Sequence, residues 1–200
     1  MPITNHTELV AAMGVRMNRT DLAAAAADAI VLYEAEANRR FRAPEQLMTV
    51  VLPAAGRVVN LPADYLQEKR VTTLDQGRRR NLEPIGIDAS TRYDSGTSSG
   101  SPVWYAIVDQ QIELMPSPGG SMSVELVYYQ TIAPLAGAPN WLLQKHPDVY
   151  LYGALKHLAI LRGDDQRLSN YKGIHDEAAS DLLRVSKRAQ YGSALQIKVG

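Results

Sequence analysis

One segment in the last third of the chain is apolar on nearly every side. Residues 149–155 (VYLYGAL) carry no charge. Pro147 suits a first helical turn because it has no amide hydrogen to leave unsatisfied, and Asp148 places a carboxylate beside the positive end of the helix dipole. Gly163 stands where a left-handed residue commonly ends a helix. The pattern predicts a buried central helix over residues 147–162, with the rest of its domain packed around it.

Two further stretches show the spacing of a helix with one buried face. The first begins after Asp21 and the second after Asp164, and both residues are typical of helix starts. The predicted buried positions are Leu22, Ala26, Ile30, Tyr33, Ala37 and Phe41 in the first helix, and Ile174, Ala178, Leu182, Val185 and Ala189 in the second. A short helix precedes them, with Asn5 or Thr7 as its cap and its end near Gly14.

The middle of the chain changes to short β-rich runs. The predicted strands are residues 46–52, 57–61, 70–74, 103–108, 111–115 and 123–129. The first two flank the turn-like residues 53–56, which predicts a hairpin. Short breaks at 109–110 and 116–120 predict that the last three strands are antiparallel neighbours. Residues 61–66 are typical of a single helical turn.

Two polar or terminal stretches stand apart from this pattern. Residues 75–101 are rich in turn residues and predict a long exposed loop, which begins close to the basic cluster Arg78, Arg79 and Arg80. The last residues, 193–200, alternate apolar and polar side chains. Alternation at a terminus is typical of a strand that joins the edge of a partner, and also of a frayed end.

The order of elements is helices, strands, then helices again, which predicts an α+β fold. We expect a helical bundle domain formed by residues 1–44 and 140–192, with one long N-terminal helix and two C-terminal helices. An antiparallel β domain, residues 45–139, is inserted into it. Residues 193–200 form a C-terminal tail.

Composition narrows the classes of function. Lysine plus arginine and aspartate plus glutamate each number 21, so no net charge attracts the whole protein to nucleic acid or to a membrane. The chain has no cysteine, which excludes disulfides, thiolate metal sites and cysteine nucleophiles. The N-terminus lacks a basic stretch followed by an apolar one, so we expect no secretory signal and synthesis in the cytoplasm. The central helix, at about 24 Å, is too short for a bilayer.

No motif for catalysis or metal binding is evident. The histidines, His6, His146, His157 and His175, lack the spacing that places two ligands on one helical face. Neighbouring carboxylates at 164/165, 176/177 and 34/36 point to different helix faces and do not form a glycosidase pair. We therefore expect no catalytic residue, no metal and no cofactor.

Six short motifs, taken in order, resemble the head-to-tail adaptor (connector) proteins of tailed bacteriophages. They are residues 61–66 (LPADYL), 100–105 (GSPVWY), 112–118 (IELMPSP), 126–129 (LVYY), 140–143 (NWLL) and 147–155 (PDVYLYGAL). The resemblance covers roughly residues 20–191. Each motif alone is a plausible turn or helix start, whereas their order and spacing together are specific.

The resemblance implies a structural virion protein without enzymatic activity. It implies a homo-oligomeric ring of about twelve copies with closed cyclic symmetry, located in the virion neck between the portal protein and a tail or nozzle protein. Double-stranded DNA would pass through the ring without sequence specificity, and no membrane is involved. The shared residues carry over as fold elements, with Gly153 allowing two helices to approach closely: Trp141, Pro147, Asp148, Tyr150, Tyr152 and Gly153.

Two surfaces are candidates for partner contacts within this resemblance. The terminal tail would bind the portal through residues Leu195, Gln196, Ile197, Lys198 and Val199. The cluster Arg78 to Arg80 would lie at a rim and contact DNA or a protein partner. Two other classes remain open: a virion-associated cell-wall glycosidase, which needs two carboxylates in one cleft, and a DNA-binding or scaffolding module, which predicts steeply salt-dependent binding to duplex DNA.

Overall fold

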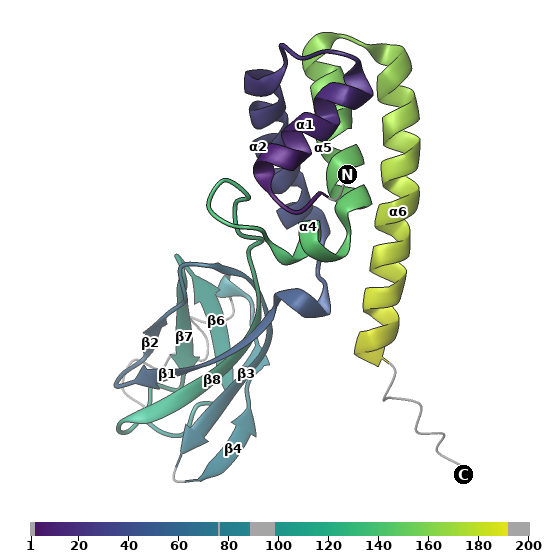
Figure 1. Cartoon of the computed structure of the whole chain (residues 1–200). Coiled ribbons are helices and arrows are strands. Elements are labelled where there is room, and N and C mark those ends of the chain that lie inside the picture. The colour runs from purple at the N-terminus through teal and green to yellow at the C-terminus, as the bar shows by residue number, and fades with distance from the viewer. Residues whose placement is uncertain (1–2, 76, 89–98, 192–200) are drawn as a thin grey trace, which may run out of the picture. The chain divides into compact units, whose positions relative to one another are not determined.

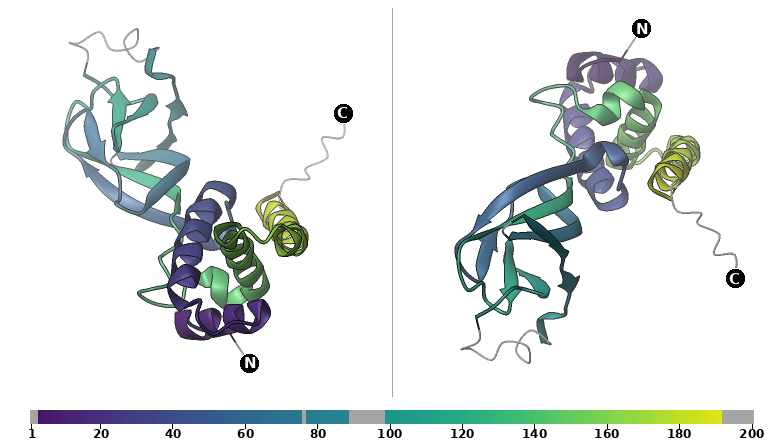
Figure 2. Two further views of the ribbon diagram at one scale, coloured as in Figure 1. Left: turned by 90° about the horizontal axis from the view of Figure 1, so that it is seen from above. Right: turned by 90° about the horizontal axis from the view of Figure 1, so that it is seen from below.

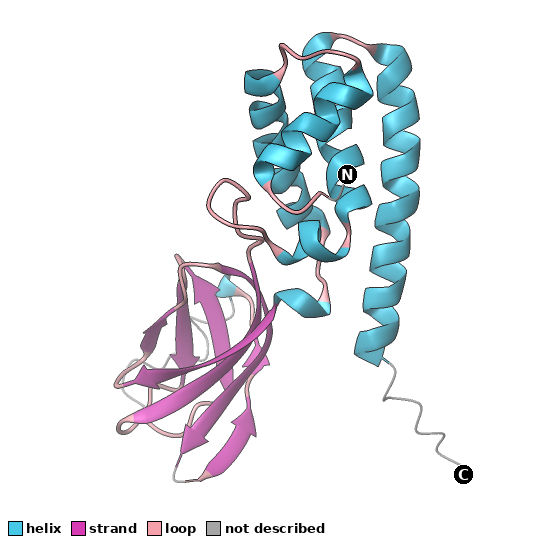
Figure 3. Cartoon of the chain, in the orientation of Figure 1, coloured by secondary structure: helices cyan, strands magenta, loops and turns pink. Residues whose placement is uncertain are grey.

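The protein has an α+β fold that divides into two compact units (Figures 1 and 3). The computed structural model describes residues 3–75, 77–88 and 99–191. One unit comprises Met1–Glu45 and Ile132–Gly200, and the other comprises Gln46–Thr131. We call them the helical unit and the strand unit.

The helical unit is built around one buried helix. Its helices are α1 (His6–Met17), α2 (Ala23–Arg40), α4 (Trp141–Lys145), α5 (Pro147–Arg162) and α6 (Asp165–Tyr191). The central helix α5 has the predicted bounds and packs against the other four. Gly163 ends it in the left-handed region, at φ 67°. Leu155 and Leu158 of α5 are fully buried, so the predicted central position is confirmed.

The two N-terminal helices differ from prediction at their ends. All six predicted buried positions of α2 are buried, from Leu22 to Phe41. However, α2 begins at Ala23 without a side-chain cap, because the cap position is held by Leu22, whose side chain has no hydrogen-bond acceptor. The carboxylate of Asp21, one residue earlier, binds the guanidinium of Arg19. Helix α1 is capped by Asn5 as predicted, but it continues to Met17, three residues beyond the predicted end.

The buried face of α6 is rotated from the predicted one. Ile174 and Val185 are 37% and 65% exposed, which contradicts their predicted burial. The residues that face the unit are Tyr171, His175, Ala179, Leu182 and Ser186. Asp164 caps the helix by accepting a hydrogen bond from the Arg167 amide. The apolar pattern predicted the wrong buried face because α6 packs partly through a histidine and a serine, His175 and Ser186.

The strand unit consists of two four-stranded sheets. Its strands are β1 (Leu47–Ala54), β2 (Val58–Asn60), β3 (Tyr65–Asp75), β4 (Arg78–Asn81), β5 (Glu83–Pro84), β6 (Trp104–Val108), β7 (Gln111–Met115) and β8 (Met122–Gln130). The first sheet has the order β1-β8-β3-β4 and is antiparallel, and the second has the order β2-β7-β6-β5. Among the named strands of the described residues, β5 and β6 pair in parallel, over two residues.

Strand partners differ from the predicted hairpins at two places. Strand β2 pairs with β7 in the second sheet, whereas β1 pairs with β8 in the first, so the β1–β2 hairpin was wrong. Pro53 lies inside β1, which tolerates it as an edge strand. Strand β8 likewise pairs with β1 and β3 rather than β7. The β6–β7 hairpin is confirmed, with positive φ at both Asp109 and Gln110.

Two local predictions for the strand unit were also wrong. The expected helical turn over 61–66 gives way to β3, which begins at Tyr65. The expected loop over 75–101 contains β4 and β5. Between the sheets lies a core to which both contribute, including Val71, Val124, Leu126, Ile112 and Leu114.

Candidate functional site

Helices α2 and α5 approach each other closely where Tyr33 of α2 meets Gly153 of α5. A Cβ atom built on Gly153 would overlap the Tyr33 ring, with Cε2, Cζ and Cδ2 as its nearest neighbours. Tyr33 is fully buried, and its ring contacts those of Tyr150 and His175 edge to face, at centroid distances of 5.2 and 5.5 Å. The aromatic ring therefore occupies the space that the missing side chain leaves on α5.

Beside this contact, charged side chains from three helices form what we call the polar cluster. Its members are Glu36 and Arg40 of α2, Lys156 and His157 of α5, and His175 and Asp176 of α6. Glu36 is the hub: its carboxylate lies 2.6 Å from Lys156 Nζ and 2.7 Å from His157 Nε2. The cluster thus ties each neighbouring helix to α5 through groups that are mostly withdrawn from water.

The cluster continues from α5 to α6. Lys156 Nζ lies 3.3 Å from His175 Nδ1, and Arg40 donates to Asp176 Oδ1 at 2.9 Å. Lys156 is 8% exposed and His175 is fully buried. A buried lysine requires a carboxylate partner, since an unpaired charge in such a place is strongly destabilising. Glu36 supplies that partner.

Burial and neighbouring charges shift the pKa of two cluster members. The hydrogen bond with His157, together with that from Lys156, outweighs partial burial and lowers the pKa of Glu36 to about 2. Burial, reinforced by the positive charge of Lys156, lowers the pKa of His175 to about 4. At neutral pH the cluster therefore contains an ionised Glu36 and a neutral His175.

Perturbed pKa values often mark catalytic groups, but this cluster has the features of a structural one. The carboxylate of Glu36 and the ammonium group of Lys156 form an ion pair with each other. Within the described ranges, 3–75, 77–88 and 99–191, no group of three His, Cys, Asp or Glu residues has a geometry that could hold a metal ion. Two buried polar atoms beside it, Tyr33 Oη and His175 Nε2, have no hydrogen-bond partner within the same ranges.

A second carboxylate of α2 organises the segment that leads into α4. Glu34 Oε1 accepts hydrogen bonds from Tyr150 Oη at 2.6 Å and from the Leu135 amide at 2.7 Å. Asn38 Oδ1 accepts from the Ile132 amide at 2.7 Å. These bonds hold the chain to α2 where it re-enters the helical unit.

The six residues that the resemblance carries over as fold elements lie along α4 and α5. Trp141 begins α4, and Pro147 and Asp148 form the first turn of α5. Tyr152 lies 6.2 Å from the ring of Tyr171 on α6 and stacks under the guanidinium of Arg16 on α1, 5.8 Å away. Tyr150 and Gly153, described above, are buried, whereas Trp141, Pro147 and Tyr152 are half-buried and Asp148 is exposed.

The arginine triplet lies on the edge strand β4, where neighbouring side chains point to opposite sides. Arg79 binds Glu125 Oε2 at 2.7 Å, and Arg70 of β3 binds the other oxygen at 3.3 Å. Glu125 is only 6% exposed. The structure therefore separates Arg79, which neutralises a buried carboxylate, from Arg78 and Arg80 on the other side of the strand.

The other predicted contact residues, Leu195 to Val199, lie outside the described residues. Sequence reasoning missed the polar cluster, although it considered His157 and His175 as metal ligands and residues 34/36 and 176/177 as carboxylate pairs. Their convergence depends on the packing of three helices and has no signature in local spacing. No helix in the described part of the chain combines the length and apolarity needed to cross a membrane.

Comparison with known proteins agrees with this layout. A search of curated proteins finds no match. The family model described as "SU10 adaptor protein" matches residues 4–197, which is nearly the whole chain and includes both units. The resemblance to head-to-tail adaptors noted from the sequence is thereby confirmed. The chain belongs to the SU10 adaptor protein family of phage head-tail adaptors.

Proposed function

We propose that this phage structural adaptor forms a ring in the virion neck, between the portal protein and a tail or nozzle protein. The observation that carries the proposal is the family match, which includes both the helical and the strand unit. The ring would hold about twelve copies in closed cyclic symmetry, and double-stranded DNA would leave the head through it. A balanced charge supports passage, since a strongly basic channel would retain phosphates by counterion release.

Each part of the chain has a role in this proposal. The helical unit is a bundle domain that carries the ring, and the strand unit is a domain inserted into it. Arg78 and Arg80, which point away from Glu125, would meet DNA or a protein partner at the rim. The tail, through Leu195, Gln196, Ile197, Lys198 and Val199, would bind a strand edge or cleft of the portal.

A cell-wall glycosidase is a poorer fit to the acidic groups of the helical unit. One groove of about 360 Å³ is lined by Glu45, Asp148 and Asp181. Burial opposes ionisation of Glu45, but the hydrogen bond from Lys145 outweighs it and holds the pKa of Glu45 below its ordinary value. A general acid needs the opposite shift. Asp181 forms an ion pair with Arg184. Asp148 lies in the first turn of α5, beside the positive end of the helix dipole.

The experiment that tests the proposal is a mass measurement of the purified chain, alone and mixed with the portal protein of the same phage. Native mass spectrometry is expected to show a portal that carries a closed set of adaptor copies. A chain that ignores the portal would overturn the proposal. In that case, cell-wall turnover and salt-dependent binding to duplex DNA would decide between the glycosidase and the DNA-binding alternatives.

A further inference from the structure

The outer face of α2 is unusually apolar for a surface helix. Its exposed positions from the second residue onward are Ala24, Asp28, Val31, Leu32, Ala35 and Arg39. Val31 is 62% exposed and Leu32 is 44% exposed. A surface helix normally turns charged and polar side chains toward water. Between Asp28 and Arg39, however, every exposed residue of this helix is aliphatic. We call this surface the α2 face.

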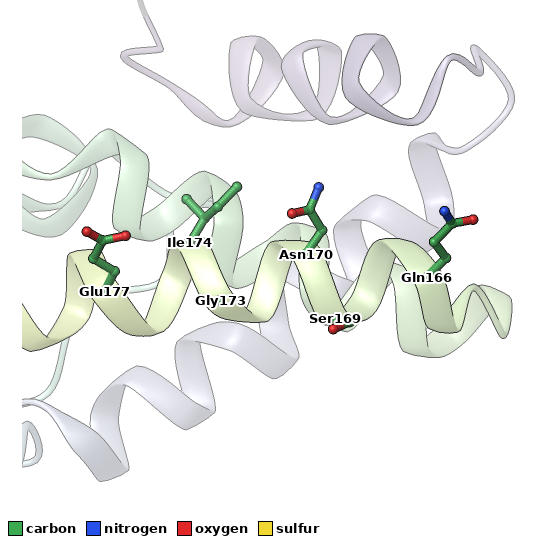
Figure 4. A pocket seen from close by; sticks show the side chains of 6 residues that line it. All are labelled: Gln166, Ser169, Asn170, Gly173, Ile174 and Glu177. Carbon is green, nitrogen blue, oxygen red and sulfur yellow. The ribbon is translucent and has the colours of Figure 1, made fainter.

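The exposed side of α6 includes, in its first half, a stretch with a single charged side chain and mostly small or polar ones. It consists of Gln166, Ser169, Asn170, Gly173, Ile174 and Glu177, which line a shallow hollow (Figure 4). No atom lies within 4 Å of a Cβ built on Gly173. Glycine is a poor helix former, and the packing of the chain itself does not require it here. We call this surface the α6 face.

The two faces lie on opposite flanks of the helical unit. Helix α5 packs against both α2 and α6 and lies between them (Figure 1, and the left view of Figure 2). Helices α2 and α6 run in the same direction. Arg167, near the start of α6, donates to the carbonyl of Met17 ahead of α2, and Arg40, at the end of α2, binds Asp176 further along α6.

We propose that the α2 face of one copy packs against the α6 face of the next copy in the ring. This inference rests on the proposed function and specifies its subunit contact. The two faces share a residue spacing, so a parallel alignment gives five pairs, written with the α2 residue first: Asp28 with Gln166, Val31 with Ser169, Leu32 with Asn170, Ala35 with Gly173, and Arg39 with Glu177.

This alignment is complementary in size and in charge. The larger side chain of Val31 meets the small Ser169, and Ala35 and Gly173 permit a close approach of the two backbones. At one end, Arg39 meets the carboxylate of Glu177. Opposite charges at the edge of an interface fix its register.

The two faces also lie at the same height along the helix axes, as is needed for copies related by rotation about an axis parallel to the helices. Arg40 and Asp176 lie at the same level within one chain, since they form an ion pair. Arg39 of one copy and Glu177 of the next therefore reach nearly the same level without a shift along the helix. Different patches on opposite flanks produce a head-to-tail contact, which is the kind that closes a ring. A two-fold pairing of α2 faces would leave the α6 face uncovered.

The test uses two single variants, Ala35→Glu and Gly173→Glu. Both positions are exposed, so each variant is expected to keep the fold and the melting temperature. Each variant alone has one blocked face, and we expect at least a tenfold loss of multi-copy species, both in concentrated solution and on the portal. Val15→Glu is the matched control, because Val15 is a 78% exposed aliphatic residue of α1 outside both faces.

Mixing the two variants gives a sharper readout. One intact α2 face and one intact α6 face remain in each mixed pair, so an equimolar mixture is expected to form 1:1 dimers and nothing larger in native mass spectrometry. Symmetric dimers of either single variant would overturn the inference. So would portal loading that is equal for the wild type and both variants, although this result would uphold the proposed function. Wild-type chains that stay single both in concentrated solution and on the portal would overturn both.

Discussion

Gly153 and Tyr33 share one space at the centre of the helical unit, since a Cβ on Gly153 would overlap the tyrosine ring. Both residues are enclosed, so neither can move aside cheaply. The contact sets how closely α2 approaches α5, and with it the position of the polar cluster that the same two helices share with α6.

Gly153→Ala is therefore expected to destabilise the helical unit by about 2–3 kcal/mol, as overpacking of a close-packed core does. The measurement is chemical denaturation followed by circular dichroism. Gly173→Ala is the matched control: no atom lies within 4 Å of its Cβ position, so it should gain about 0.5–1 kcal/mol from helix propensity. Equal effects at the two glycines would contradict the packing argument.

Lys156→Met is expected to cost about 3 kcal/mol, because it removes the lysine that Glu36 binds and leaves the carboxylate partly buried. Glu36→Gln should cost a similar amount. The double variant should lose less than the sum of the single losses, and the difference measures their coupling. Arg184→Ala, which breaks an exposed pair with Asp181, serves as the control and should cost under about 1 kcal/mol.

His175 makes the stability of the helical unit depend on pH. Its pKa is about 4 in the folded protein and 6.5 when unperturbed. Between these values the unfolded chain binds a proton that the folded chain does not, so the free energy of unfolding falls as pH falls, by up to about 1.4 kcal/mol per unit.

His175→Gln should remove this dependence between pH 6.5 and 4, which denaturation at several pH values would show as a flatter profile. Glu36 affects the stability of the helical unit in a lower pH range. Its pKa rises from about 2 in the folded protein to 4.5 when unperturbed, so its stabilising contribution is lost as pH falls from 4.5 toward 2. If the stability of His175→Gln changed with pH in parallel with that of the wild type, the assignment of this pH dependence to His175 would be contradicted.

The three arginines of β4 should differ in their effect on stability. Arg79→Ala is expected to destabilise the strand unit by about 1–2 kcal/mol, because the buried carboxylate of Glu125 loses its closer partner. Arg78→Ala and Arg80→Ala, at exposed positions, should change it by less than about 0.5 kcal/mol. Three equal losses in denaturation experiments would show that the Glu125 contact does not govern stability.

Deletion of residues 193–200 is expected to abolish portal binding while leaving the melting temperature unchanged. The alternation of apolar side chains suggests a narrower change, Leu195→Asp with Ile197→Asp, since both would lie on one side of an extended segment. Gln196→Ala is the control on the other side. Unchanged binding after the deletion, measured by co-sedimentation with the portal, would contradict the role of the tail.

The helices were more predictable from the sequence than the sheets because their signals are local. Pro147 and Gly163 mark the ends of α5 within a few residues of its apolar run. Strand β8, by contrast, was recognised as a strand but given the wrong partner. Its partners β1 and β3 lie more than 45 residues away, and no turn residue specifies them.

The polar cluster shows the same limit for a site. Glu36, Lys156 and His175 are evident in the sequence as titratable residues, but they belong to three helices that are far apart along the chain. Apolar periodicity even suggested the wrong face of α6, through Ile174, because the helix buries His175 in its place. A buried polar residue is recognised only once its partners are known.

The hydrogen bonds of Asn38 with Ile132 and of Glu34 with Leu135 fix the point at which the chain returns to the helical unit. They belong entirely to that unit, so they do not depend on what the chain builds between residues 46 and 131. Evolution can therefore lengthen, shorten or exchange the strand unit at little entropic cost, since closing a longer loop costs only about 0.6 kcal/mol for each doubling of its length. The helical scaffold can stay constant while the inserted part adapts to a new neighbour.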